Sequence, residues 1–153
     1  MGSKVQFITD LEDLIQRLLI TLNNENDYPI LISGTFDHEL FKKLLKMLLD
    51  NNKINKCKIL MPFVSNSGIL SRVYINRICN AGGMIRITSM FRKNLIIIGT
   101  EVFILSLSSR YLKDLGIKSN FECAVHTDDS NTINYINEMF KEIWDKSLPI
   151  MID

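Results

Sequence analysis

The centre of the chain reads Asn94-Leu95-Ile96-Ile97-Ile98-Gly99-Thr100-Glu101-Val102-Phe103-Ile104-Leu105. Two apolar runs of strand length, rich in β-branched and aromatic residues, flank the pair Gly99-Thr100. Runs of this composition joined by a short turn that contains glycine are typical of a β-hairpin. We therefore expect strands over Asn94–Ile98 and Glu101–Leu105, and the remaining elements are placed outward from this pair.

Before the hairpin, strand-like and helix-like segments alternate. After Asp10, leucine and isoleucine recur at spacings of three and four, which indicates one buried helix face that Thr9 or Asp10 can cap. In order, we expect strand Val5–Ile8, a helix from Asp10, strand Tyr28–Ser33, a helix from Thr35, strand Lys58–Phe63, a helix closed by Ala81-Gly82-Gly83, and strand Met84–Thr88.

After the hairpin, we expect a loop over Ser106–Ser119 with one helical turn, and then a strand over Asn120–Val125. A last helix is capped by Asp128, Asp129 or Ser130. Its inner face consists of Ile133, Ile136, Phe140, Ile143 and Trp144. The alternation predicts an α/β fold with a mixed, largely parallel β-sheet flanked by helices on both faces. We expect a single domain over residues 1–153, in which residues 1–3 read equally as native sequence or as a remnant of cloning.

The composition is that of an ordinary globular protein. The chain has 153 residues, 46% hydrophobic and 23% charged, which argues against disorder. The formal net charge of +1 draws no anionic partner to the molecule as a whole, so anion binding needs a local patch. The apolar runs are too short to cross a membrane. Three cysteines without a CxxC spacing favour buried thiols and a cytoplasmic location, and we expect no metal site.

Two segments carry a resemblance to a known family. Residues 91–108 read FRKNLIIIGTEVFILSLS, and residues 115–122 read LGIKSNFE. In order and spacing they resemble the phospholipase D superfamily, in which a histidine, a lysine and an aspartate precede a strand and a Gly-Ser-x-Asn turn. An Asn-Phe-Glu strand start follows later in that family. The similarity extends over roughly residues 28 to 146 and implies a phospholipase D-like fold.

The chain departs from the family motif where the chemistry is expected. Phe91 stands in place of the nucleophilic histidine, and phenylalanine can neither attack phosphorus nor transfer a proton. The other replaced positions are Ile98 for the aspartate, Leu105 for the glycine and Ser108 for the asparagine. Lys93, Ser106 and Glu122 match the family. On this ground we expect no catalytic residue, no cofactor and no enzyme activity.

Two groups of residues follow as candidates for binding. A basic patch of Arg86, Arg92, Lys93 and Arg110, with Ser106, can hold phosphate or a nucleic-acid backbone, although solvated surface charges are the commoner explanation. Single-motif members of the family form twofold dimers. The resemblance therefore implies a homodimer whose interface includes the degenerate motif positions Phe91, Ile98, Leu105, Ser108 and Glu122.

The function expected from the sequence is that of an inactive phospholipase D-like module. It would act as a homodimeric binding, assembly or regulatory domain, associated with nucleic-acid machinery or with a protein partner, and without membrane insertion. Two alternatives remain open. One is a small-ligand effector domain of a transcription regulator, and the other is a residual phosphodiesterase or nuclease that uses other residues.

Overall fold

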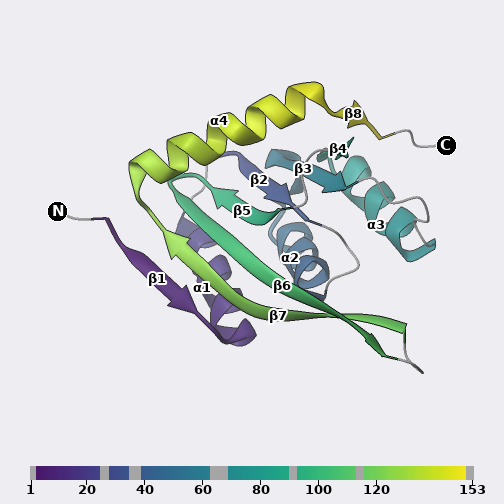
Figure 1. Ribbon diagram of the computed structural model, residues 1–153. Helices are drawn as coiled ribbons and strands as arrows, with labels where there is room; N and C mark the ends of the chain where they lie inside the picture. Colours follow the sequence, from purple (N-terminus) through teal and green to yellow (C-terminus); the bar gives the residue numbers. More distant parts are fainter. Residues whose placement is uncertain are drawn as a thin grey trace.

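The computed structural model describes residues 3–24, 28–34, 39–62, 69–89, 93–112 and 116–150, except for the side chains of 69–71, 108–112 and 116–120. Its centre is an eight-stranded sheet in the order β1-β7-β6-β5-β2-β3-β4-β8 (Figure 1). The strands are β1 (Val5–Ile8), β2 (Ile30–Ser33), β3 (Cys57–Pro62), β4 (Met84–Thr88), β5 (Asn94–Ile98), β6 (Glu101–Leu112), β7 (Gly116–Thr127) and β8 (Leu148–Pro149). The helices are α1 (Leu11–Asn24), α2 (Glu39–Asp50), the 3-10 helix η1 (Ile54–Lys56), α3 (Ile69–Asn80) and α4 (Ser130–Lys146).

The sheet is mixed, as expected, but it is mostly antiparallel rather than largely parallel. Only β2–β3 and β3–β4 run parallel among the pairs of described strands. The central hairpin β5–β6 enters antiparallel to β2, and β7 and β1 continue that alternation. The expectation was wrong because helical crossovers make parallel neighbours only of β2, β3 and β4, whereas β1 pairs with β7 at the far edge of the sheet.

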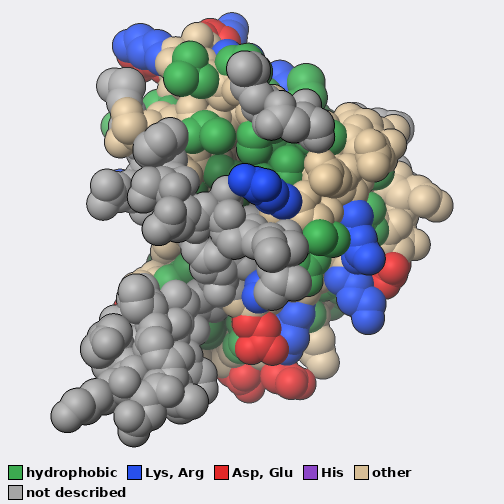
Figure 2. Space-filling view, turned by 90° about the vertical axis from the view of Figure 1, so that its right-hand side faces the viewer, with side chains coloured by type: hydrophobic (Ala, Val, Ile, Leu, Met, Phe, Trp, Pro, Cys, Tyr) green, Lys and Arg blue, Asp and Glu red, His purple; other side chains and the backbone are tan. Residues whose placement is uncertain are grey.

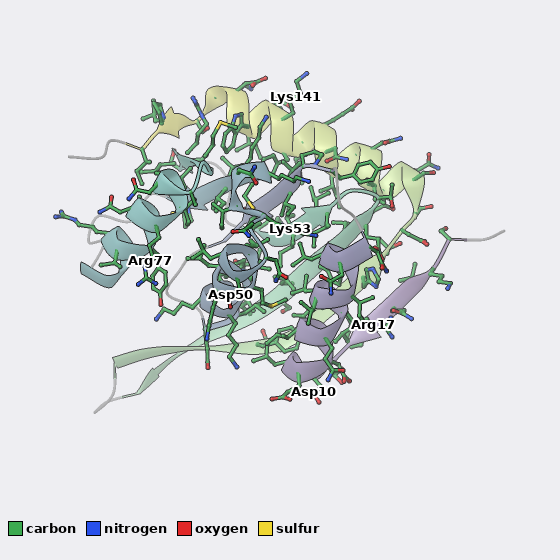
Figure 3. All side chains as sticks on the ribbon, turned by 180° about the vertical axis from the view of Figure 1, so that it is seen from behind. Asp10, Arg17, Asp50, Lys53, Arg77 and Lys141 are labelled. Atoms are coloured by element: carbon green, nitrogen blue, oxygen red, sulfur yellow. The ribbon has the colours of Figure 1, made fainter. Side chains whose placement is uncertain are left out.

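Helices cover both faces of the sheet, as predicted. The larger core cluster packs the apolar faces of α1 and α2 against one side of the sheet, the side that faces the viewer in Figure 3. Ile75 and Ile78 of α3 belong to the same cluster. The smaller cluster joins Ile133, Ile136 and Phe140 of α4 to Leu95, Ile97 and Val102 on the other side. In β5 the alternation is plain, since Ile96 and Ile98 belong to the first cluster and Leu95 and Ile97 to the second. The side of the sheet that α4 packs against is called the α4 face below.

The predicted helix ends are confirmed where they lie in the described residues. Gly82 has a φ of 93° after α3, and the N–H groups of Gly82 and Gly83 donate to the carbonyls of Cys79 and Ile78. Among the three cap residues proposed for α4, Asp129 accepts hydrogen bonds from the N–H and hydroxyl of Thr132. These bonds, with a third from Ser3, hold the pKa of the Asp129 carboxyl below its usual value. The proposed start of the second helix at residues 35–37 lies outside the described residues.

The loop expected over Ser106–Ser119 is instead a long hairpin. Strands β6 and β7 pair through Leu112↔Gly116, and their outer half extends past the body of the sheet (Figure 1). The segment looked like a loop because its serines and its single glycine dilute the apolar alternation that marks a strand. Pairing between β6 and β7 holds the described residues of this segment in extended strands, and such pairing cannot be read from the sequence pattern.

Candidate phosphate site

Lys93 lies directly before β5, on a backbone that a buried hydroxyl holds in place. The hydroxyl of Ser33, at the end of β2, donates to the Lys93 carbonyl oxygen at 2.6 Å. Ser33 is buried, and the Lys93 side chain is exposed. The backbone of Lys93 is therefore held in place while its ammonium group reaches solvent. This arrangement suits a residue that binds a ligand from solution.

Ser106 and Glu122 come together at an irregularity in the β6–β7 pairing. Ser106 pairs with Cys123 and the next residue, Leu107, pairs with Phe121, so Glu122 is the extra residue of a β-bulge. The Ser106 hydroxyl donates to Glu122 Oε1 at 3.2 Å, and both side chains are exposed. Bulges occur near functional sites because they redirect a side chain out of the regular alternation.

The strand register brings Lys93 to the same place. Asn94 pairs with Leu105, so the next position outward on each strand sets Lys93 opposite Ser106. Lys93 shares the alternation of Leu95 and Ile97, and Ser106 shares that of Val102, all on the α4 face. The three residues that match the family motif therefore form one cluster on this face of the sheet.

The cluster has the chemistry of a weak anion site. The Lys93 ammonium supplies positive charge, but the single hydroxyl hydrogen of Ser106 is donated to Glu122. A phosphate would gain that donor only if the hydroxyl rotated, and the Glu122 carboxylate would repel it meanwhile. The face drawn in Figure 2 carries both basic and acidic side chains among the described residues. Because the formal net charge of the chain is only +1, local contacts, rather than a broad field, must determine the affinity for anions.

Arg86, proposed for the same patch, is placed elsewhere. It lies in β4, and both β3 and β2 separate it from β5, a distance of about 14 Å at the usual strand spacing. Its Nε and Nη2 donate to the hydroxyl and carbonyl oxygens of Ser147 at 2.8 and 2.6 Å. The Trp144 ring lies 5.6 Å from its guanidinium carbon. The structure therefore binds Arg86 to the end of α4 and does not join it to Lys93.

The degenerate motif positions also separate. Ile98 is fully buried in the larger core cluster, and Leu105 is 7% exposed in the same cluster. Neither offers surface to a second molecule, so the expected dimer interface does not include them. Phe91 and Arg92 lie outside the described residues, and Ser108 and Arg110 are described in their backbone only.

A polar pair that the sequence did not reveal lies on the other face of the sheet. His126 of β7 faces Glu101 Oε1 through Nε2 at 2.8 Å and Gln6 Oε1 through Nδ1 at 3.4 Å. Its ring stacks on Phe103 at 4.3 Å between centroids. Strand pairing alone brings Glu101 next to His126, so no spacing along the chain could have indicated it. In the described residues, no group of three His, Cys, Asp or Glu side chains could hold a metal ion.

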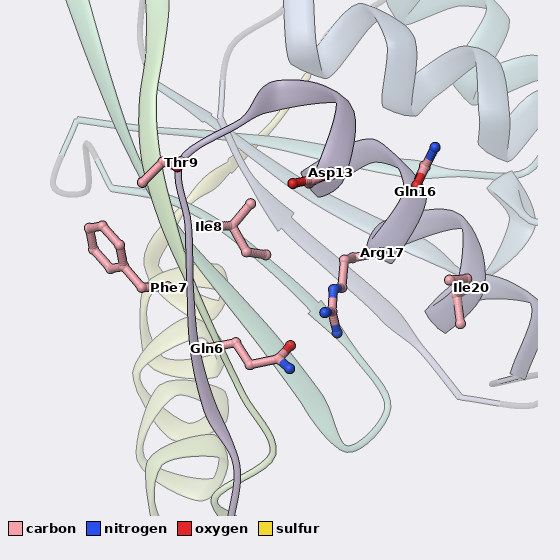
Figure 4. Close-up of a pocket in the computed structure, with 8 residues that line it drawn as sticks. All are labelled: Gln6, Phe7, Ile8, Thr9, Asp13, Gln16, Arg17 and Ile20. Carbon is pink, nitrogen blue, oxygen red and sulfur yellow. The ribbon is translucent and has the colours of Figure 1, made fainter.

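A cavity of about 690 Å³ opens between β1 and α1, also away from Lys93. Gln6 and Arg17 extend into the space between these two elements, whereas Phe7 points away from it (Figure 4). Its lining consists of Gln6, Phe7, Ile8, Thr9, Asp13, Gln16, Arg17 and Ile20. The cavity is therefore separate from the motif cluster, which lies on the opposite face.

No family model matches the chain, and no curated protein matches it in sequence. Solved structures do. Nuc of Salmonella typhimurium, a phospholipase D family member, matches at a TM-score of 0.71 and 21% identity over 99% of this chain and 100% of that one. NucT of Helicobacter pylori matches at a TM-score of 0.71 and 14% identity, and the match covers 97% of this chain and 100% of NucT. TrmBL2, an archaeal chromatin protein with a novel mode of DNA binding, matches at 0.64 and 19%; the match covers 96% of this chain but only 54% of TrmBL2.

The chain therefore has a phospholipase D-like fold. The prediction that it is not an enzyme is contradicted by the likeness of the chain to Nuc, a phospholipase D family member, and to NucT. That prediction rested on replaced motif positions, above all Phe91 for the histidine and Ile98 for the aspartate, and such replacements exclude only a reaction through the missing side chains. No helix among the described residues has the length and apolarity needed to span a membrane.

Proposed function

We propose that this chain is a nucleic-acid-binding domain that holds the phosphate backbone at Lys93 and Ser106. The observation that carries the proposal is the register of β5, β6 and β7, which gathers Lys93, Ser106 and Glu122 although 29 positions separate the first from the last. DNA binding by TrmBL2, which shares the fold, supports a nucleic-acid ligand.

Each residue of the cluster has a distinct role in the proposed site. Lys93 neutralises a backbone phosphate and releases a counterion, which makes the affinity depend on salt. Ser106 donates its hydroxyl to a phosphate oxygen once it turns from Glu122. The Glu122 carboxylate opposes the phosphate and weakens binding. It thereby favours ligands that offer several contacts over a lone phosphate ion.

The opposite charges of Lys93 and Glu122 give the test. We expect Lys93→Ala to weaken binding to a 20-base-pair DNA duplex about fivefold, and Glu122→Gln to strengthen it by a similar factor, as measured by fluorescence anisotropy at 100 mM salt. Glutamine keeps an acceptor for the Ser106 hydroxyl but removes the repulsion. The exposed Lys46 of α2, changed to alanine, is the matched control.

Equal affinities for all four proteins would reject the site. Weaker binding of both site variants would also reject it, because disturbed packing, rather than charge, would then govern the result. A denaturing gel of the same duplex reports cleavage independently of binding.

We further propose that the domain is a homodimer formed through the α4 face. Phe7 pairs with Val125, which pairs with Ile104. Phe7 is 68% and Ile104 39% exposed, and Val125 is half-buried between them. An apolar row of this kind beside a polar cluster is typical of an interface between subunits. A twofold axis through the row would bring two Lys93–Ser106–Glu122 clusters close together.

The dimer has a simple test. We expect Phe7→Glu to convert the dimer to a monomer in analytical ultracentrifugation at about 10 μM, because a buried interface does not accept an unpaired carboxylate. The control is Tyr135→Glu, since Tyr135 of α4 is 69% exposed but lies outside the row. A wild-type chain that sediments as a monomer would exclude the homodimer.

A further inference from the structure

Strand β1 forms one edge of the sheet, and β7 is its only neighbour among the described strands. The backbone N–H of Asp128 donates to the carbonyl oxygen of Lys4, so Lys4 occupies a hydrogen-bonded position next to β7. Because these positions alternate along an antiparallel pair, Gln6 also directs its backbone groups to β7, whereas Phe7 directs its N–H and C=O groups to the open edge. Such an edge can accept a further strand.

The cavity between β1 and α1 lies along this open edge. Two residues connect the strand to the helix, and α1 then runs back beside β1 (Figures 1 and 4). Phe7 lines the cavity although its ring points away from it, so the Phe7 backbone forms this part of the wall. The volume of about 690 Å³ falls within the range of ligand-binding sites. A strand that paired with β1 would therefore occupy the cavity.

Two opposite charges on α1 face the occupant of the cavity. Asp13 and Arg17 both line it, and both side chains are exposed. In Figure 4 the Asp13 carboxylate points toward β1, and the Arg17 side chain extends into the space. The acid lies one helical turn before the base, which is the favoured arrangement for an ion pair on a helix. Neither has an ion-pair partner among the described residues, so both are available to a ligand.

The spacing of these charges matches that of side chains on a strand. Four residues of a helix rise about 6 Å, and two residues of a strand rise about 6.8 Å on one face. A strand antiparallel to β1 would place one side chain beside Asp13 and the next but one beside Arg17. The residue between them would lie opposite Phe7, on the α4 face. There it would extend the exposed apolar row of Phe7, Val125 and Ile104, so an apolar residue suits this position.

We infer that the open edge of β1 binds an extended peptide segment of a partner protein with the order basic, apolar, acidic. The segment adds a strand antiparallel to β1, and its basic residue pairs with Asp13 while its acidic residue pairs with Arg17. In strand addition, main-chain hydrogen bonds supply affinity and alternate side chains supply specificity. The site uses none of the residues of the proposed phosphate site, and the inference does not depend on nucleic-acid binding.

A charge exchange between protein and peptide tests the side-chain contacts. The probe is a fluorescently labelled peptide, Thr-Thr-Lys-Val-Glu-Thr-Thr, with blocked termini, and its binding is followed by anisotropy at low salt. Arg17→Glu should weaken binding about tenfold or more, because two carboxylates then meet. Replacing the peptide glutamate with lysine should restore the affinity of this variant to within about threefold of the original pair. Arg77→Glu is the matched control, since Arg77 of α3 is exposed and does not line the cavity.

Methylation of the peptide backbone tests the strand pairing itself. The N–H of the peptide valine would donate to the Phe7 carbonyl oxygen, whereas the N–H of the next residue points away from β1. N-methylation of the valine should weaken binding about tenfold or more, and N-methylation of the glutamate less than about threefold.

Three results would overturn the inference. The first is an equal effect of the two methylations, and the second is equal affinity of wild type, Arg17→Glu and Arg77→Glu for the peptide. The third is a wild-type chain that does not bind the peptide. If that chain also associates with itself through β1, the open edge belongs to a second copy rather than to a partner protein.

Discussion

Replacing Phe103 with alanine should lower the free energy of unfolding by about 3–5 kcal/mol. Phe103 is fully buried in the larger core cluster, and its ring is nearly parallel to that of His126, at an angle of 4°. The substitution leaves a cavity beneath α1 and α2 that the rigid strand β6 cannot close. It also removes the surface on which the His126 ring rests between Glu101 and Gln6. Urea denaturation followed by circular dichroism measures the loss.

The neighbour Ile104 provides the control for Phe103. It lies on the same strand but on the α4 face and is 39% exposed, so Ile104→Ala should cost less than about 1 kcal/mol in the monomer. If the two variants were equally stable, Phe103 would not be a central residue of the core, and the assignment of faces in β6 would be wrong.

The second large effect is expected at Arg86, the arginine that the sequence placed in a basic patch. Arg86→Ala should cost about 2–3 kcal/mol, because it leaves the buried Ser147 without its charged donor. It also removes one of two cations near Trp144, whose ring lies 5.6 Å from both the Lys58 ammonium and the Arg86 guanidinium. The loss should be concentrated at the end of α4, where hydrogen exchange of the last helical amides would accelerate.

Lysine at position 86 tests the geometry of this contact. Arg86→Lys keeps the charge but lacks the planar fork whose two nitrogens donate to the two Ser147 oxygens, so its stability should lie between those of Arg86→Ala and wild type. Were Arg86→Ala to reduce DNA affinity without loss of stability, Arg86 would be a ligand residue, and its placement against α4 would be of secondary importance.

Local signals predicted the regular elements well. The hairpin at Gly99-Thr100, strand Met84–Thr88 and the inner face of α4 are found as expected, because side-chain periodicity and glycine turns act within a few residues. The buried face of α3 is less easily assigned, since Val73 is 43% exposed whereas Ile75 is buried. That helix carries apolar residues at more positions than one face can bury, so periodicity alone could not select the face.

Long-range pairing could not be read from the sequence in the same way. The direction of the strands depends on which neighbour each one meets, and β1 meets β7 from more than a hundred positions away. The position of the Arg86 side chain depends on Ser147 at the end of α4, and the length of β6 depends on its pairing with β7. The motif cluster was identified because the family resemblance supplied the pairing that composition and periodicity lack. The same resemblance did not predict the β-bulge that brings Glu122 to Ser106.

The most direct test of the proposed phosphate site is the salt dependence of duplex binding for wild type and Lys93→Ala. The account predicts that log affinity falls linearly with log salt for both proteins, and that the slope of the variant is shallower by about 0.9, the loss of one phosphate contact. Parallel lines would contradict it, because Lys93 would then contribute no contact to the nucleic-acid backbone.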